Sequence, residues 1–187
     1  MKNAKEKVIA IALGEVGYLE KETPEKLDST LENAGDENYT RYARDLDAIN
    51  FYNGKKNGFA WCDVFVDWCF VKVFGEREAR KVTFQPRIYL LNKGAGCRYS
   101  FGYYQEKGRI FQTPEIGDQI FFYAADGKTI CHTGLVWNTD DTYVYTVEGN
   151  TSNRSGVVDN GGEVCKKKYL LTDERLAGYG RPLYEEK

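Results

Sequence analysis

Histidine, methionine and proline are scarce in this 187-residue sequence, which contains one, one and four of them respectively. Because His132 carries the single imidazole, any reaction that requires a histidine base must use it. The sequence also lacks an apolar run close to the roughly 18 residues that a membrane-spanning helix requires. We therefore predict no membrane insertion and look to one residue for imidazole chemistry.

An excess of charge of either sign is missing as well. The formal net charge is -2, with 26 basic and 28 acidic residues. This balance gives no reason to expect a nucleic acid or an anionic membrane as a partner. The length fits a single domain, residues 1–187, with one core of useful size.

No segment has the pattern of a signal peptide. The apolar patch Val8–Leu13 is short, follows a helical pattern and lies between Glu6 and Glu15. If the protein acts outside the cell, we expect it to be released by lysis or exported as part of a longer protein.

The five cysteines form neither a CxxC pair nor a zinc-type spacing. Because their number is odd, we expect no disulfide framework and at least one free thiol, and we predict no metal and no cofactor. A metal site built from Cys62, Cys69, Cys131 and His132 is the alternative. It is disfavoured because Cys131 and His132 are neighbours on a predicted strand and point to opposite faces.

The predicted elements are helical in the first part of the chain and strand-like afterwards. Residues 76–91 suggest a short helix, whereas residues 95–108 show no period that identifies an element. Helices followed by a run of antiparallel strands indicate an α+β domain. The other predicted helices cover residues 3–20, 39–49 and 62–74, and the strands cover residues 119–123, 131–137, 143–148, 163–171 and 178–183.

Cys62 begins an apolar helix after residues 53–58, a loop that contains glycine and asparagine. Cys62, Phe65, Cys69 and Val73 recur at helical spacing and predict a face directed to the core. A cysteine in the first helical turn lies at the positive end of the helix dipole, which favours the thiolate. The simpler interpretation is that Cys62 is a small buried apolar residue.

His132 has a cross-strand neighbour if the two strands on either side of residues 138–142 form a hairpin. A three-residue loop, residues 139–141, would set His132 directly opposite Glu148 on the same face. A two-residue loop at residues 140–141 would pair His132 with Gly149 and put the two side chains on opposite faces. With the first register, the carboxylate can orient the imidazole and leave its other nitrogen for a thiol.

Four sequence blocks resemble CHAP domains, cysteine amidases and peptidases of the papain-like NlpC/P60 superfamily, and most closely those of phage lysins and phage-derived proteins. The resemblance covers the chain from about Ile9 to Pro182. The blocks are Trp61-Cys62 followed by Phe65-Val66-Asp67-Trp68, then Pro114–Asp118 with Ile120-Phe121-Phe122, His132–Val136 and Val147–Asn150.

This resemblance implies a role for each matching residue. Cys62 would be the nucleophile, His132 the general base and acid, and Glu148 the residue that orients His132. Asn150 would support the site by hydrogen bonding. The family fold implies N-terminal helices packed on a C-terminal antiparallel sheet, and the backbone N–H of Cys62 is the expected oxyanion donor.

Aromatic residues near Cys62 suggest a surface for the substrate. Trp61 and Tyr104 are the predicted substrate-binding residues, whereas the position of Trp68 on the helix favours packing. Some CHAP domains bind calcium in an acidic loop before the cysteine. Asp45 and Asp47 are the nearest alternating carboxylates here, and a solvated charged turn is the better interpretation of them.

The resemblance implies a peptidoglycan hydrolase that acts at the bacterial cell wall through a thioester intermediate. Two candidates remain for the bond that is cleaved: the N-acetylmuramoyl–L-alanine amide, and a peptide bond of the stem or cross-bridge. The alternatives are a catalytically inactive wall-binding or structural module of the same fold, and a secreted antibacterial toxin. Retention of Cys62, His132 and Glu148 together argues against an inactive module, because binding alone needs none of them.

Overall fold

The computed structural model describes residues 3–158 and 160–184 and has an α+β fold, as predicted. No helix in these ranges is long and apolar enough to cross a membrane. The helices are α1 (Ala4–Gly14), α2 (Arg41–Ala48), α3 (Cys62–Val82) and α4 (Cys97–Glu106), with a 3₁₀ turn, η1 (Tyr89–Leu91). The strands are β1 (Ile110–Phe111), β2 (Gln119–Tyr123), β3 (Ile130–Thr139), β4 (Tyr143–Thr151), β5 (Glu163–Leu170) and β6 (Leu176–Gly180).

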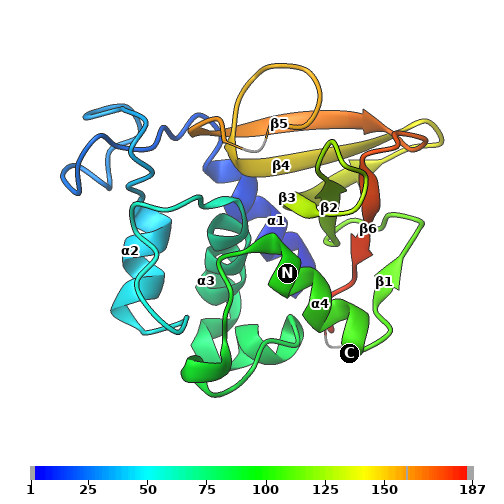
Figure 1. Ribbon diagram of the computed structural model, residues 1–187, viewed down its shortest axis with the longest axis horizontal. Coiled ribbons are helices and arrows are strands. Elements are labelled where there is room, and N and C mark those ends of the chain that lie inside the picture. The colour runs from blue at the N-terminus through cyan, green and yellow to red at the C-terminus, as the bar shows by residue number, and fades with distance from the viewer. Residues whose placement is uncertain (1–2, 159, 185–187) are drawn as a thin grey trace.

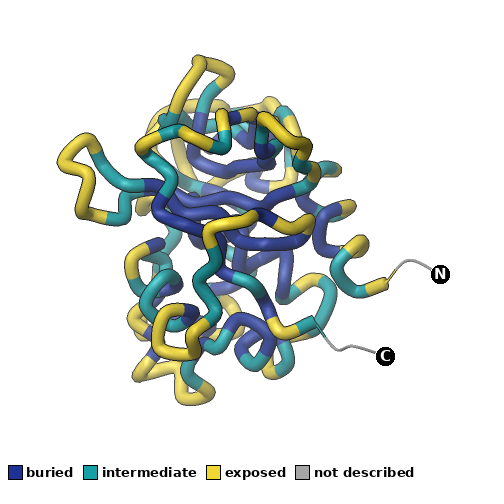
Figure 2. The backbone as a smooth tube through the Cα atoms, turned by 90° about the vertical axis from the view of Figure 1, so that its right-hand side faces the viewer, coloured by how far each residue is buried: buried dark blue, intermediate teal, exposed yellow. Residues whose placement is uncertain are grey.

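The strands form one antiparallel sheet in the order β1-β6-β2-β3-β4-β5. The helices lie on one side of the sheet, and α3 contacts α1, α2, β3 and β4 (Figure 1). The main core lies between helices and sheet and includes Leu135, whereas Val136 belongs to a second apolar cluster, as expected for neighbours on a strand. Figure 2 shows the buried strands crossing the middle of the molecule, with exposed loops around them.

Two glycines determine where the predicted helices end. Gly17 takes a φ of 92°, and its N–H donates to the oxygen of Val164, so the chain leaves the helical path well before residue 20. Gly75, with a φ of 73° and a ψ of 165°, bends α3 at the residue where the sequence predicts its end. A second helical segment continues from this bend to Val82.

Helix α4 is the main element that the sequence pattern does not predict. Its buried residues Cys97, Ser100 and Tyr104 do recur at helical spacing. Gly102 and the polar residues between them conceal this stripe. The helix matters for the site because its first residue, Cys97, contacts Cys62.

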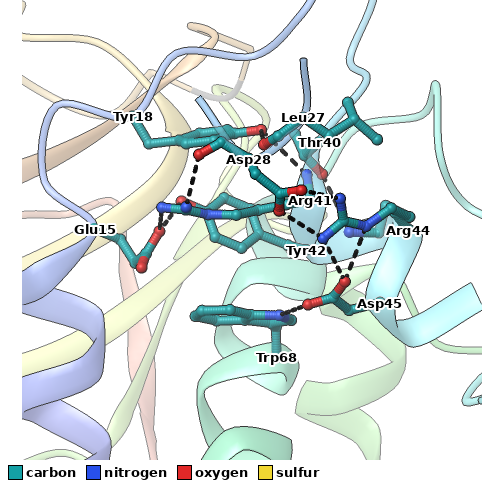
Figure 3. Close-up of polar contacts among 11 residues, drawn as sticks. Glu15, Tyr18, Leu27, Asp28, Thr40, Arg41, Tyr42, Arg44, Asp45 and Trp68 are labelled. Atoms are coloured by element: carbon teal, nitrogen blue, oxygen red, sulfur yellow. Dashed lines mark hydrogen bonds and ion pairs between the residues drawn. The ribbon is translucent and has the colours of Figure 1, made fainter. Parts of the chain in front are cut away.

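A cluster of charged and aromatic side chains ties the segment after α1 to α2 and α3 (Figure 3). Arg41 and Tyr42 both donate to Oε2 of Glu15, the Tyr42 hydroxyl from 2.8 Å. Tyr42 is fully buried and packs edge-on against Phe65 and Trp68 of α3. The cluster therefore fixes α2 against the helix that carries Cys62.

Asp45 and Asp47 have structural partners that the sequence does not indicate. Asp45 accepts a hydrogen bond from Nε1 of Trp68 at 2.9 Å, and Trp68 is buried, as predicted (Figure 3). Asp47 accepts from the backbone N–H groups of Lys56 and Asn57 at 2.8 and 3.0 Å. Both carboxylates are half-buried, so the prediction of a solvated turn is wrong.

Candidate active site

The β3–β4 hairpin brings His132 and Glu148 together in a register that differs from the predicted one. Leu135 pairs with Val147, and the same register continued along the strands sets His132 opposite Asn150. Glu148 is therefore a diagonal neighbour of His132 on the same face, at a distance that long side chains can bridge. The direct pairing of His132 with Glu148 is wrong, although the predicted contact between them is present.

A bulge in β3 puts the two side chains on one face. The N–H of Asp140 donates to the oxygen of Tyr143, which closes a loop shorter than the predicted one. The pairing then shifts by one residue between Val136 and Asn138. Because a shift of one residue exchanges the faces of a strand, the hairpin without this bulge would separate His132 from Glu148.

Glu148 orients the imidazole from a fully buried position. Nε2 of His132 lies 3.0 Å from Oε2 of Glu148, and neither side chain is exposed. Since the carboxylate occupies Nε2, Nδ1 is the ring nitrogen left to interact with Cys62, whose proximity raises the pKa of His132. His132 therefore lies between Glu148, which it contacts directly, and Cys62, with which it interacts electrostatically.

Two hydroxyl groups complete the surroundings of Glu148. Thr146 donates to Oε1 at 2.5 Å, and Tyr169, from the neighbouring strand β5, donates to Oε2 at 3.1 Å. A buried carboxylate needs such donors because it has lost its hydration. Neither residue is indicated by the sequence pattern. Alternating burial along β5 points Tyr169 inward, but only the fold brings it to Glu148.

Cys62 is the first residue of α3, 5% exposed, and its surroundings favour the thiolate. A hydrogen bond with Cys97 lowers the pKa of Cys62 most, and burial opposes this effect. The hydrogen bond and charge of His132 and the backbone N–H of Asp63 lower the pKa further, so that it lies well below 9.0. The helix N-terminus was predicted to favour the thiolate, and here the backbone N–H of Asp63 provides this effect.

His132 carries the matching positive charge. Burial lowers its pKa, but hydrogen bonds with Cys62 and Glu148 and the charges of both outweigh burial and raise the pKa to about 10. These opposite shifts favour a thiolate–imidazolium pair of Cys62 and His132. Such a pair combines a nucleophile with a proton donor.

Cys97 is a member of the site that the sequence did not reveal. The interaction with Cys62, together with burial, raises the pKa of Cys97, so it remains a thiol, and its Sγ donates to the carbonyl oxygen of Ile130 at 3.6 Å. The contact is held in place nearby, where Ser100 donates to Asp63 at 2.8 Å. Gln119 also donates to Asp63, at 3.0 Å, and connects the first turns of α3 and α4 to β2.

Asn150 is fully buried on β4 beyond Glu148. Its φ of 54° lies in the left-handed region, which asparagine tolerates better than most residues. Its backbone oxygen accepts from the N–H of Gly161 and so holds the loop that follows β4. Support of the site by its side chain stays a prediction.

Trp61 and Tyr104 cannot stack on a substrate, because both are fully buried. Nε1 of Trp61 donates to Glu20 at 2.6 Å, and Tyr104 packs edge-on against Phe84. The prediction that they bind substrate is therefore wrong. A pattern of aromatic residues does not distinguish a core from a binding surface. Nearby aromatic surface comes instead from Phe59, which is 62% exposed, and from half-buried Tyr99.

Potential metal ligands gather away from these residues. Carboxylate oxygens of Glu22, Asp36 and Glu37 lie within 4.8 Å of one another, and all three side chains are exposed. Exposed acidic groups of this kind repel one another and are well hydrated, so we assign no ion to them.

Comparison with known proteins gives a similarity of fold. No protein-family model matches the chain, and no curated protein matches it. The crystal structure of Ly7917 is similar to this fold, with a TM-score of 0.54 and 10% sequence identity. The similarity covers 97% of this chain, which spans 62% of the Ly7917 chain. At this level of identity the similarity concerns the fold alone.

Proposed function

We propose that this protein is a cysteine hydrolase with a papain-like NlpC/P60 fold that cleaves amide bonds in bacterial peptidoglycan at the cell wall. The observation that carries the proposal is the buried chain Cys62–His132–Glu148, in which the pKa of Cys62 is lowered and that of His132 is raised. The resemblance of the sequence blocks to CHAP domains supports peptidoglycan as the substrate.

The reaction begins with attack of the Cys62 thiolate on the carbonyl carbon of the amide. The oxyanion that forms lies near the first turn of α3, whose backbone N–H groups have no partner within the helix. The imidazolium of His132 then gives its proton to the leaving amine, and a thioester remains on Cys62. Glu148 stabilises the imidazolium and keeps Nδ1 directed at the sulfur.

Hydrolysis of the thioester completes the cycle. Neutral His132 takes a proton from water, the resulting hydroxide attacks the thioester carbonyl, and Cys62 leaves as the thiolate. The product is a carboxylic acid, and His132 is an imidazolium again. The same steps cleave either the N-acetylmuramoyl–L-alanine amide or a peptide bond of the stem or cross-bridge.

Digestion of purified peptidoglycan tests the proposal directly. The intact protein should release soluble fragments, and Cys62→Ala should release none. Cys69→Ala is the matched control, since Cys69 is buried in the core on the same helix and should affect stability alone. Mass spectrometry then identifies the bond: new N-terminal L-Ala indicates an amidase, and any other new terminus an endopeptidase. An intact, folded protein that releases nothing from several wall types contradicts the proposal.

A further inference from the structure

A groove of about 520 Å³ opens beside the start of α3. Two loops form its walls, one before α3 and one before α4. The lining residues are Asn53, Lys55, Lys56, Phe59, Ala60, Lys93, Gly94, Ala95, Gly96 and Tyr99. The proposed reaction uses none of these side chains.

Buried contacts hold the two walls in place. The backbone N–H of Asn53 donates to the oxygen of Asn92 at 3.0 Å and joins one loop to the other. Asn92 is fully buried, and its side chain donates to the oxygen of Phe51 and to Gln85. A Cβ atom on Gly94 would lie 2.8 Å from Asn92 Oδ1, so the chain can approach this closely only with glycine there. The groove is therefore a preformed feature.

The groove is strongly basic, although the whole chain has a net charge of -2. Lys55, Lys56 and Lys93 line it, and its lining contains no carboxylate. Within the ranges that the structure describes, no ion pair engages any of these three lysines. Asp47 lies behind one wall, where its carboxylate accepts backbone N–H groups of Lys56 and Asn57. Three ammonium groups without a counter-charge favour an anionic ligand.

The groove borders the candidate nucleophile on two sides. Ala60 precedes Cys62 by two residues, which limits their Cα separation to about 7 Å. Gly96 is joined directly to Cys97, whose thiol contacts Cys62. A peptide whose amide bond is held at Cys62 can therefore extend into the groove. Exposed Phe59 offers an apolar surface between these charges.

We propose that this groove binds a free carboxylate of the peptide next to the scissile bond, so that the enzyme prefers acidic stems to amidated ones. The inference rests on the proposed function and names the substrate class of the same site. Many peptide stems carry a carboxylate on the second residue, which is either free, as isoglutamate, or converted to the amide, as isoglutamine. The lysines distinguish the two because only the carboxylate gains charge-assisted hydrogen bonds.

A pair of muramoyl peptide stems that differ only in this group tests the preference. We expect the intact enzyme to have a kcat/KM about tenfold higher on the isoglutamate stem. Lys93→Met and Lys55→Met should lower kcat/KM on this stem and change it less than twofold on the isoglutamine stem. Lys128→Met, an exposed lysine outside the groove, is the matched control. Equal rates on both stems, or an equal loss on both in the groove variants, would overturn the proposal.

A binding experiment separates this proposal from the proposed function. Cys62→Ala cannot turn over, so the difference between its affinities for the two stems reports the contribution of the groove. Tighter binding of the isoglutamate stem that is lost in Cys62→Ala/Lys93→Met supports the groove even if no wall is digested. Digestion of walls without any preference in binding contradicts the groove and leaves the hydrolase intact. A poly(glycerol phosphate) that competes as strongly as the acidic stem would show a site for polyanions and contradict the peptide carboxylate.

Discussion

Two carboxylates in this protein have nearly the same partners and different surroundings. Oε2 of Glu15 accepts hydrogen bonds from Tyr42 and from the guanidinium of Arg41 (Figure 3). Oε2 of Glu148 accepts from Tyr169 and binds the imidazole of His132. In both regions a tyrosine and a cation share one carboxylate oxygen.

The two regions differ in what their cation can do. An arginine keeps its proton at every accessible pH, so the cluster around Glu15 has a fixed charge and can only hold α2 in place. His132 can lose and regain a proton, and it contacts Cys62 as well as Glu148. Burial and the neighbouring carboxylates raise the pKa values of Tyr42 and Tyr169, so both remain donors. The mobile proton is therefore what separates a candidate site from a structural anchor.

Removing the cation from each region should give the largest difference between them. His132→Gln keeps a polar side chain but has no base, and we expect kcat/KM on peptidoglycan fragments to fall by about 10³-fold. Arg41→Gln should leave kcat/KM of the folded enzyme within twofold and lower the free energy of unfolding by about 1–3 kcal/mol. Hydrolysis rates and denaturant unfolding of both variants measure the two effects. An Arg41→Gln enzyme that is folded but inactive would show that the two regions do not differ in this way.

Changing each carboxylate to its amide tests the charge rather than the shape. Glu148→Gln no longer stabilises the imidazolium, and we expect kcat/KM to fall by about 10²-fold. Glu15→Gln should cost stability and leave the rate of the folded enzyme nearly unchanged. Far-ultraviolet circular dichroism confirms that each variant is folded before rates are compared. A loss of rate in Glu15→Gln as large as that in Glu148→Gln would contradict the comparison.

The sequence predicts much of this fold because its strands are short apolar runs between turn residues and its helices begin and end near loop residues. The strand predicted at residues 119–123 coincides with β2, and the predicted helix at residues 39–49 contains α2. The hairpin register was beyond sequence reasoning, because the bulge between Val136 and Asn138 has no local signature. The contact between His132 and Glu148 is nevertheless present, since the actual register differs from the predicted one by an even number of residues.

The rest of the candidate site depends on contacts between segments that are distant in the sequence. Cys97 reaches Cys62 through the packing of α4, an element with little periodicity, and Tyr169 reaches Glu148 across the β4–β5 pairing. Trp61 adjoins the candidate nucleophile in the sequence, but its ring lies in the core against Tyr42. Burial of single side chains is set by tertiary packing, which local patterns do not specify.

The pH dependence of the reaction should reveal the charges that distinguish the site. We expect kcat/KM to rise as Cys62 loses its proton, well below pH 9.0, and to fall as His132 loses its proton near pH 10. The charge of His132 should stabilise the fold fully below pH 6.5, its ordinary pKa, and progressively less as the pH rises to about 10. Rates and unfolding free energies measured across this range test both expectations.

Substitutions of Cys97 test what sets the position of the acid limb of this pH profile. Cys97→Ala removes the side chain that lowers the pKa of Cys62 most, so this pKa should rise and the acid limb should move to higher pH. Cys97→Ser keeps a donor and should leave the limb near its original position. Iodoacetamide labelling of Cys62 at pH 6 provides a second measurement, since burial raises the pKa of Cys69 and keeps that thiol unreactive. Labelling of Cys62 no faster than that of Cys69 would contradict the thiolate.

The two tyrosines should show the smallest and most direct contrast. Tyr169→Phe removes one of the donors to Glu148 and leaves the others, so we expect kcat/KM to fall by about threefold to tenfold. The alkaline limb of the pH–rate profile of this variant should move as well. With fewer hydrogen-bond donors, the carboxylate of Glu148 interacts with the imidazolium with a different strength, and this changes the pKa of His132. Tyr42→Phe removes the equivalent donor to Glu15 and should lower stability by about 1–2 kcal/mol with no change in the pH profile. Both substitutions delete one hydroxyl from a buried ring. A shifted pH profile in Tyr169→Phe alone would show that this hydroxyl acts through the proton of His132. Equal stability losses with unchanged pH profiles would instead show that Tyr169 only anchors the fold, as Tyr42 does.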